Sequence, residues 1–155
     1  MELISVIIPY FKKKTFIKEA VYSVLNQTYQ NFEIIIIYDD SDVKDLNYIN
    51  EIASTNDKIK IIINPKNIGA GLSRNLGIKS SKGKYIAFLD SDDIWRRDKL
   101  EIQLADFKKN NYKISHTSYE IIDINNKRIS NRKAKNFNSY KDLLKSCDIG
   151  LSTVI

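Results

Sequence analysis

The stretch YIAFLDSDD, residues 85–93, places three carboxylates, those of Asp90, Asp92 and Asp93, directly after a run that is apolar apart from its first tyrosine. An apolar run of this length without alternation is typical of a strand that is buried on both faces. Carboxylates crowded at one point repel one another, so the arrangement is costly unless a cation or hydrogen-bond donors lie among them. We therefore expect a positive group at the end of this strand.

The same pattern recurs along the chain and alternates with helical periods. The predicted buried strands are Ile4–Ile8, Phe32–Tyr38, Ile59–Ile63 and Tyr85–Leu89. Helical periods lie between and after these runs. Thr15 is predicted to cap a first helix that carries Ile17, Val21, Val24 and Leu25, and Leu46, Ile49 and Ala53 mark a second. A third helix is predicted from Gly69–Ala70 to about Ser80, and a fourth carries Leu100, Leu104 and Phe107 on one face. This alternation predicts an α/β fold with a mostly parallel sheet flanked by helices.

Acidic residues follow a second predicted strand as well, in YDDSD at residues 38–42, and the first strand ends in PYFKK. If these strands are parallel neighbours, the three stretches meet at the carboxyl edge of the sheet, where such folds bind ligands. Carboxylates suit Mg²⁺ or Mn²⁺, which proteins often hold together with substrate phosphates. A single aspartate is equally suited to capping, and Asp92 or Asp93 could cap the following helix. The repetition after separate strands favours a metal-bridged diphosphate site.

Composition indicates one globular domain over residues 1–155, with 43% hydrophobic and 28% charged residues. The single cysteine, Cys147, cannot form an internal disulfide and is expected to be a small buried hydrophobe. The first residues lack a basic region before their short apolar run, and no stretch approaches the roughly 18 apolar residues of a membrane span. These features predict a cytoplasmic protein.

Positive charge is concentrated in residues 125–145, which hold seven of the 25 Lys and Arg residues and one of the 19 Asp and Glu residues. A solvated basic loop and helix is the simpler interpretation. The alternative is a patch facing anionic lipid head groups, hence peripheral association with the inner face of the membrane, or an acidic partner. Nucleic-acid binding calls for aromatic residues among the charges, and only Phe137 and Tyr140 occur in this segment, so we expect no nucleic-acid partner.

Longer stretches of the chain resemble the family 2 glycosyltransferases, which have the GT-A (nucleotide-diphospho-sugar transferase, Rossmann-like) fold. The resemblance is carried by SVIIPYF at 5–11, QTYQNFEIIIIYDDSD at 27–42, NPKNIGAGLSRNLGIKSSKGKYIAFLDSDDIW at 64–95 and, more weakly, STVI at 152–155. A lone Asp-x-Asp means little, but Asn-x-Gly-x-x-x-x-Arg-Asn followed by Gly-Lys-Tyr-x-x-Phe-Leu-Asp-x-Asp-Asp at this spacing is specific. The family would place donor nucleotide binding in about 1–110 and the start of an acceptor-side part in about 111–155.

The resemblance implies transfer of a sugar from a nucleotide diphosphate sugar, often a UDP-sugar, to a saccharide or lipid-linked acceptor. Such transfer is metal-dependent and inverting, and serves cell-surface polysaccharide or glycan synthesis. Phe11 would stack on the base, Asp40 would accept a hydrogen bond from the base edge, and Arg74 would lie near the base and the acidic rim. The implied donor-binding positions are Pro9, Phe11, Asp40, Gly69, Arg74, Asp90, Ser91 and Asp92, and the implied Mn²⁺ or Mg²⁺ ligands are Asp92 and Asp93.

Two of these roles have structural alternatives on the residues alone. Phe11 suits a core position as well as stacking, and Arg74 could bridge Asp40 or Asp90. The chain also departs from the family pattern, with Tyr10-Phe11-Lys12 where relatives carry Thr-Tyr-Asn, and DDSD where DDGS is usual. The loop after the paired aspartates is therefore expected to differ in shape.

The catalytic base of the family belongs to a segment beyond residue 155, so we expect a domain truncated at its C-terminal side and assign no base. His116 is predicted to be a strand residue rather than a base. A sheet ended in this way predicts an exposed strand edge, apolar surface and self-association as a homo-oligomer. Two other functions stay open: a non-catalytic sugar-nucleotide-binding or assembly module, and a Mg²⁺-dependent phosphoacceptor signalling domain.

Overall fold

The computed structural model describes residues 2–135, 141 and 149–155. Its main sheet has four parallel strands in the order β3-β2-β1-β4. The strands are β1 (Ile4–Tyr10), β2 (Phe32–Tyr38), β3 (Ile59–Ile63) and β4 (Tyr85–Phe88). Parallel neighbours need crossover connections, and helices supply them here. The predicted α/β fold with a parallel sheet flanked by helices is confirmed.

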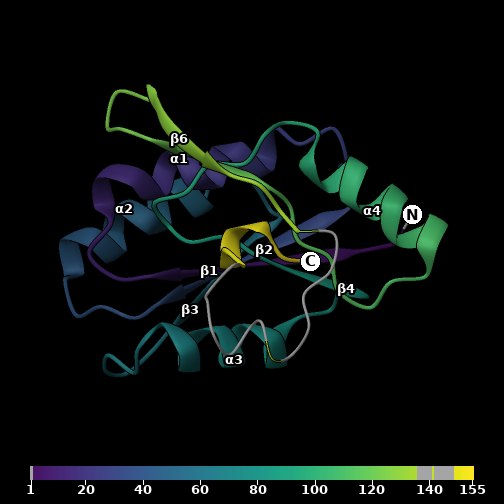
Figure 1. The fold of residues 1–155 in the computed structure, drawn as a ribbon. Helices are drawn as coiled ribbons and strands as arrows, with labels where there is room; N and C mark the ends of the chain where they lie inside the picture. Colours follow the sequence, from purple (N-terminus) through teal and green to yellow (C-terminus); the bar gives the residue numbers. More distant parts are fainter. Residues whose placement is uncertain (1, 136–140, 142–148) are drawn as a thin grey trace.

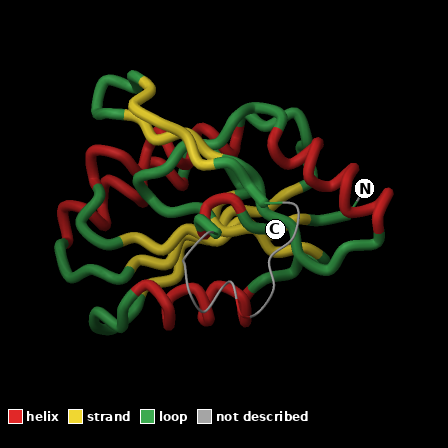
Figure 2. Tube along the Cα trace, viewed as in Figure 1, coloured by secondary structure: helices red, strands yellow, loops and turns green. Residues whose placement is uncertain are grey.

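Helices cover both faces of this sheet (Figure 1). They are α1 (Lys14–Leu25), α2 (Val43–Ala53), α3 (Ala70–Ser80) and α4 (Lys99–Asn110). In the view of Figures 1 and 2, α1, α2 and α4 lie above the sheet and α3 lies below it, so helices cover the sheet on both sides.

Alternate residues of the central strands fill the two interfaces between these layers. On one face, Ile4, Val6 and Ile8 of β1 belong to a large buried cluster that includes residues of α1, α2 and α4. On the other face, Ile7 joins Ile35 and Ile37 of β2 against Leu76 of α3. Two-sided burial explains why these strands are continuous apolar runs rather than alternating ones.

The predicted burial of β3 on both faces is wrong. β3 is an edge strand among the described strands, and its side chains are only partly covered, with Ile63 55% exposed. Strand order depends on tertiary pairing, which a local apolar run does not encode. The other strand predictions are close: β1 extends two residues further, to Tyr10, and β4 ends at Phe88.

The helices do not begin at the residues that were predicted to cap them. The first helix begins at Lys14, so Thr15 lies inside its first turn, and its N-cap residue, Lys13, makes no side-chain cap hydrogen bond. α2 is capped by Asp42, whose Oδ1 accepts hydrogen bonds from Lys44 N at 2.8 Å and Asp45 N at 3.3 Å. The helix after the acidic motif starts only at Lys99. The predicted cap by Asp92 or Asp93 is therefore wrong.

A buried polar cluster lies near the opposite, amino-terminal end of the sheet. Glu33 accepts hydrogen bonds from Ser5 Oγ at 2.7 Å, Lys82 N at 2.7 Å and Lys60 Nζ at 2.8 Å. Ser5 Oγ in turn accepts one from Gly83 N at 2.8 Å. Every polar group of this cluster is therefore paired, as burial requires.

A separate antiparallel hairpin follows α4, formed by β5 (Tyr119–Ile122) and β6 (Arg128–Arg132). It lies near α1 in Figure 1. His116 precedes β5 in a loop, so its prediction as a strand residue is wrong.

The last residues form a short 3-10 helix, η1 (Leu151–Thr153), beside β4. Phe88 N donates to Val154 O at 3.3 Å, and Trp95 Nε1 donates to Ser152 O at 2.6 Å. The C-terminal residues thus partly cover the β4 edge of the sheet. The predicted self-association stays a prediction.

Two further predictions fall on residues outside the described ones. Cys147 lies there, as does much of the second half of the basic segment 125–145. Within the described part of the chain, no helix has the length and apolar character needed to cross a membrane.

Candidate functional site

The ends of β1, β2 and β4 meet at one edge of the sheet, as the sequence predicts. Tyr10 pairs with Tyr38 at the ends of β1 and β2, and Ile7 pairs with Phe88 at the end of β4. The loops that follow these strands therefore emerge side by side at the carboxyl edge. Their acidic residues occupy that edge, but each has a distinct environment.

Asp39 is structural. It is 2% exposed, and its carboxylate accepts hydrogen bonds from Asn64 Nδ2, Ile68 N and Gly69 N, each at 2.8 Å. Asn67 Nδ2 also donates to Asp39 O at 2.7 Å. These bonds fix the loop before α3, whose N-cap Gly69 has a φ of 84°, a conformation that favours glycine.

Asp40 turns toward the loop after β1. Its Oδ2 accepts a hydrogen bond from Lys12 N at 3.1 Å, and its Oδ1 accepts one from Ser41 N at 2.7 Å. Lys12 has a φ of 53°, an uncommon conformation for a side-chain-bearing residue. The bond from Lys12 N therefore couples the shape of the Phe11 loop to Asp40.

Arg74 of α3 provides one of the expected positive groups. Its guanidinium contacts Asp90 Oδ1 at 2.5 Å, so of the two alternative partners the structure selects Asp90. The side chain is 16% exposed, and its buried Nε has no hydrogen-bond partner among the described residues. A buried unpaired donor is costly, so this arginine is held at an energetic cost beside the acidic motif.

These residues surround an open pocket with a cavity volume of about 220 Å³. Phe11 is 45% exposed at its wall, so a core role for this ring is excluded. Of the positions implied by the resemblance, those lining the pocket are Pro9, Phe11, Arg74, Asp90, Ser91 and Asp92. Asp40 and Gly69 lie outside its lining and act on the loops that border it.

The second positive group is Lys13, whose Nζ lies 2.8 Å from Asp92 Oδ2. Asp92 raises the pKa of Lys13 by a hydrogen bond and by its charge. Sequence reasoning included Lys13 only within the PYFKK stretch and gave it no role. Its contact depends on the approach of the loop after β1 to the loop after β4, which a local pattern does not reveal.

Asp93 accepts a hydrogen bond from Ser152 Oγ at 2.5 Å, and Asp90 N donates to the same hydroxyl at 2.9 Å. Burial raises the pKa of Asp93, and the charges of Asp90 and Asp92 add to this, whereas the bond from Ser152 opposes it. Ser152 belongs to η1, so the C-terminal residues hold the acidic motif in place. This contact gives a structural reason for the weak STVI resemblance.

The donor set is suited to a hard cation. Asp92 and Asp93 are adjacent carboxylates in the loop after β4, and oxygen ligands match Mg²⁺ or Mn²⁺. No group of three or more potential metal ligands occurs within residues 2–135, 141 and 149–155. Magnesium commonly binds through one or two carboxylates with substrate phosphates, so two are enough.

Comparison with known proteins agrees with this geometry. A family profile described as glycosyl transferase family 2 matches residues 5–154. An uncharacterized glycosyltransferase of Rickettsia conorii is 44% identical over 98% of this chain, and the UDP-Glc:alpha-D-GlcNAc-diphosphoundecaprenol beta-1,3-glucosyltransferase WfgD of Escherichia coli is 39% identical over 99%. The chain spans 25% of the length of the first protein and 59% of the second.

Solved structures show the same fold. S. aureus TarS 1–349 in complex with UDP-GlcNAc superposes with a TM-score of 0.66 and 25% identity, covering 74% of this chain and 33% of TarS. The mannosyltransferase PcManGT of Pyrobaculum calidifontis, in complex with GDP-Man and Mn²⁺, has a TM-score of 0.68 at 17% identity, covering 74% and 34%. The predicted GT-A fold is confirmed, and the chain belongs to the family 2 glycosyltransferases.

Proposed function

We propose that this chain binds a UDP-sugar with a divalent metal and serves its metal-dependent, inverting transfer to a lipid-linked saccharide in polysaccharide synthesis. The observation that carries the proposal is the pocket at the carboxyl edge, which Arg74, Asp90 and Asp92 line together. A diphosphate would pair with the positive charge of Arg74, and the divalent cation that it carries would pair with the negative carboxylates of the acidic motif. The names of WfgD and of the TarS complex support the uridine nucleotide.

The side chains around the pocket take the following roles in this proposal. Phe11 presents an exposed ring on which the base stacks. Asp40 keeps lone pairs beyond its two backbone contacts and accepts a hydrogen bond from a base N–H. Asp90 and Ser91 hold the ribose. Pro9 and Gly69 shape the loops that border the pocket.

Asp92 and Asp93 hold the metal, Mn²⁺ or Mg²⁺. When bound, that ion neutralises the charge that develops on the departing nucleoside diphosphate. To hold the metal, Asp92 would give up its ion pair with Lys13, and Asp93 would use a lone pair that does not accept the hydrogen bond from Ser152 Oγ. The Lys13–Asp92 pair is exposed to solvent, so its exchange costs little.

Inversion requires a base that takes the proton from the acceptor hydroxyl as it attacks the anomeric carbon from the face opposite the leaving group. We assign no residue of this chain to that role. In our proposal residues 1–110 provide the donor half, and residues 111–155 begin the acceptor side. The lipid-linked acceptor would place the protein at the inner face of the membrane, with the basic segment 125–145 toward anionic head groups.

Calorimetry with UDP tests the proposal directly. We expect binding in the presence of Mn²⁺ and at least a tenfold weaker affinity after chelation, because the cation screens the phosphates from Asp90 and Asp92. Asp92→Asn should abolish the metal dependence. The matched control is Asp98→Asn, a half-buried aspartate at the start of α4 that makes no side-chain cap bond and only a 3.7 Å contact with the exposed Arg96. Metal-independent binding, or no binding by folded protein, contradicts the proposal.

A further inference from the structure

The loop that carries Phe11, residues 11–13, is tied to helix α2 at both of its ends. Just before the loop, the hydroxyl of Tyr10, the last residue of β1, donates a hydrogen bond to Asp45 Oδ2 at 2.6 Å. Just after it, Nζ of Lys14, the first residue of α1, lies 3.1 Å from Asp45 Oδ1. One carboxylate in the first turn of α2 therefore holds both ends of the Phe11 loop.

The ring of Tyr10 is also fixed by its packing. It is fully buried and stacks on the ring of Tyr38, its partner at the end of β2, with centroids 5.4 Å apart and 11° between the planes. The Tyr38 hydroxyl in turn donates a hydrogen bond to Asp42 O, at the N-cap of α2. The two tyrosines that end β1 and β2 are therefore anchored as a stacked pair at the start of the same helix.

The hydrogen bond between Tyr10 and Asp45 joins a neutral donor to an ionised acceptor. Burial raises the pKa of Tyr10, and the hydrogen bond to Asp45 adds to this, so the hydroxyl keeps its proton. The same bond lowers the pKa of Asp45, and Lys14 acts in the same direction. Hydrogen bonds to a charged group are among the stronger ones in proteins, so this contact is well suited to holding a loop.

The Phe11 loop needs such support because its backbone is strained. Lys12 has a φ of 53°, a conformation that asparagine adopts more readily than lysine does. The family pattern has asparagine at this position and threonine in place of Tyr10, and a threonine side chain is too short to reach α2. This chain therefore lacks the residue that suits the turn and has instead a contact that holds the turn in shape.

The anchored tyrosines adjoin the two residues that contact the base in the proposed function. Phe11 follows Tyr10 directly, and Asp40 lies two residues after Tyr38. The backbone N–H of Lys12 donates to Asp40 Oδ2 at 3.1 Å and links the two loops. The aromatic ring and the carboxylate are therefore held in a fixed mutual position, as recognition of a base by stacking and an edge hydrogen bond requires.

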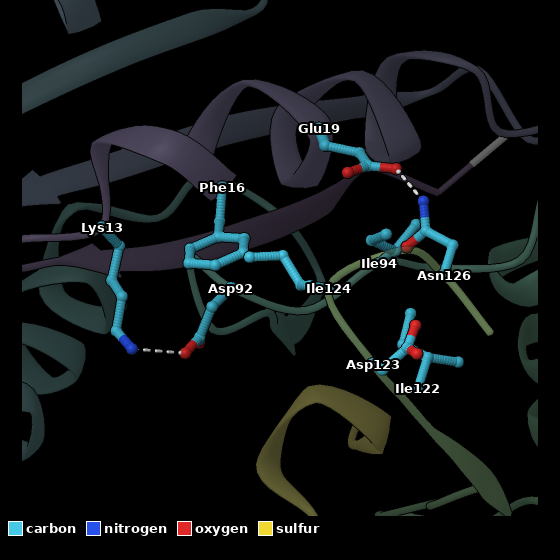
Figure 3. A pocket seen from close by; sticks show the side chains of 9 residues that line it. All are labelled: Lys13, Phe16, Glu19, Asp92, Ile94, Ile122, Asp123, Ile124 and Asn126. Carbon is cyan, nitrogen blue, oxygen red and sulfur yellow. Dashed lines mark hydrogen bonds and ion pairs between the residues drawn. The ribbon is translucent and has the colours of Figure 1, made fainter. Parts of the chain in front are cut away.

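A third contact of the Phe11 loop is given up in the proposed function. Nζ of Lys13 lies 2.8 Å from Asp92 Oδ2, and Figure 3 draws this ion pair at the wall of a neighbouring cavity. The metal of the proposed function takes Asp92 and releases Lys13. The contacts of Asp45 do not involve the acidic motif, so they keep Phe11 in place while nucleotide and metal bind.

We propose that Tyr10 and Asp45 are positioning residues for the base of the donor nucleotide. They hold the Phe11 loop in the shape that receives uracil. They act through Phe11, because the Tyr10 side chain is buried and Asp45 lies outside the lining of the donor pocket. This inference deepens the proposed function and rests on it. It assigns to the pair a share of the affinity for the base and none of the affinity for the diphosphate.

Calorimetry in the presence of Mn²⁺ with UDP and with ribose 5-diphosphate tests this role, because the second probe lacks only the base. Tyr10→Phe keeps the stacked ring and removes the hydroxyl. We expect it to weaken UDP binding about fivefold, at the low end of the roughly 5- to 150-fold cost of losing a base–aromatic stack, because Phe11 is misplaced rather than removed. Asp45→Ala, in a partly exposed turn, removes both contacts and should weaken UDP binding by about tenfold. Neither variant should change the affinity for ribose 5-diphosphate by more than about twofold.

The matched control is Tyr29→Phe. This variant also removes a tyrosine hydroxyl that donates a hydrogen bond, here to Glu2 O, but it does so before β1 and β2, at the opposite end of the sheet. Both probes should bind to it as they bind to the unaltered chain, and far-UV circular dichroism shows that each variant is folded. An equal loss of UDP affinity in Tyr29→Phe would reveal a general effect of stability and overturn the inference.

The remaining outcomes separate the two proposals. If UDP binds with Mn²⁺ but either Tyr10→Phe or Asp45→Ala binds it as tightly as the unaltered chain, or loses both probes equally, the inference is overturned and the proposed function stands. If the unaltered chain does not bind UDP, the proposed function fails and the inference falls with it.

Discussion

Replacement of Asp39 by asparagine is the sharpest test of how the loop before α3 is held. Oδ1 of Asp39 accepts hydrogen bonds from Asn64 Nδ2 and Ile68 N, and Oδ2 accepts one from Gly69 N. Asparagine has nearly the same size but only one acceptor oxygen. If that oxygen takes the place of Oδ1, the amide NH₂ group faces the N–H of Gly69.

The free-energy cost follows from these contacts. A hydrogen bond to a charged group contributes about 1.5–3 kcal/mol, and a buried unsatisfied donor costs about 1–3 kcal/mol. The carboxylate is 2% exposed, so water does not replace the lost partner. We expect Asp39→Asn to lower the free energy of unfolding by about 3 kcal/mol, or Tm by roughly 6–12 °C for a chain of this length.

Urea denaturation followed by far-UV circular dichroism measures this change, and amide exchange at Gly69 shows whether it is local. The matched control is Asp42→Asn, in the same DDSD stretch, because asparagine caps helices as well as aspartate does. A loss below about 1 kcal/mol for Asp39→Asn, or equal losses for both variants, would refute the reasoning.

Three further predictions concern the packing and the pH dependence of stability. A Cβ at Gly77 would lie 2.5 Å from Ile7 Cγ2, so Gly77→Ala should cost about 1–3 kcal/mol in thermal melts, whereas Gly71→Ala, with open space around its Cβ, should be neutral or stabilising. Burial alone would raise the pKa of Glu33, but the hydrogen bonds that it accepts outweigh this and lower the pKa below 4.5. The contribution of ionised Glu33 to the free energy of unfolding is therefore present above pH 4.5 and lost as the pH falls through the folded-state pKa. Glu33→Gln should then flatten the acid limb of a stability–pH curve, and an unchanged limb would contradict this. Burial lowers the pKa of Lys99 to about 7, so between this value and the unfolded value of 10.5 the unfolded chain binds the extra proton. The gain in stability from Lys99→Met should therefore be largest below pH 7 and shrink toward pH 9. A pH-independent gain would show that burial does not lower the pKa of this amine.

The layered arrangement of sheet and helices could be predicted from the sequence because it depends on local patterns of apolar residues. Predominantly apolar runs predict Phe32–Tyr38 and Ile4–Ile8 as strands covered on both faces, and α3 begins and ends where predicted. The alternation of strand and helix then implies parallel pairing, and parallel pairing places the acidic loops at one edge. The resemblance to the family supplied the roles that chemistry alone left open.

The remaining features depend on contacts between residues that are distant in the sequence. Asp39 and Asp40 are neighbours in one acidic run, but Asp39 holds a loop nearly 30 residues further on while Asp40 meets the loop after β1. Lys13 pairs with Asp92, and Ser152 binds Asp93, across still longer separations. Local patterns cannot assign such partners, and they missed the edge position of β3 for the same reason.

A crystal structure of the chain with a UDP-sugar and Mn²⁺ tests the central claim most directly. We predict the uracil ring on Phe11, the diphosphate beside Arg74, and the metal bridging the diphosphate to Asp92 and Asp93, with Lys13 displaced from Asp92. Nucleotide density at any other place on the sheet, or a metal that leaves the Lys13–Asp92 pair intact, would contradict it.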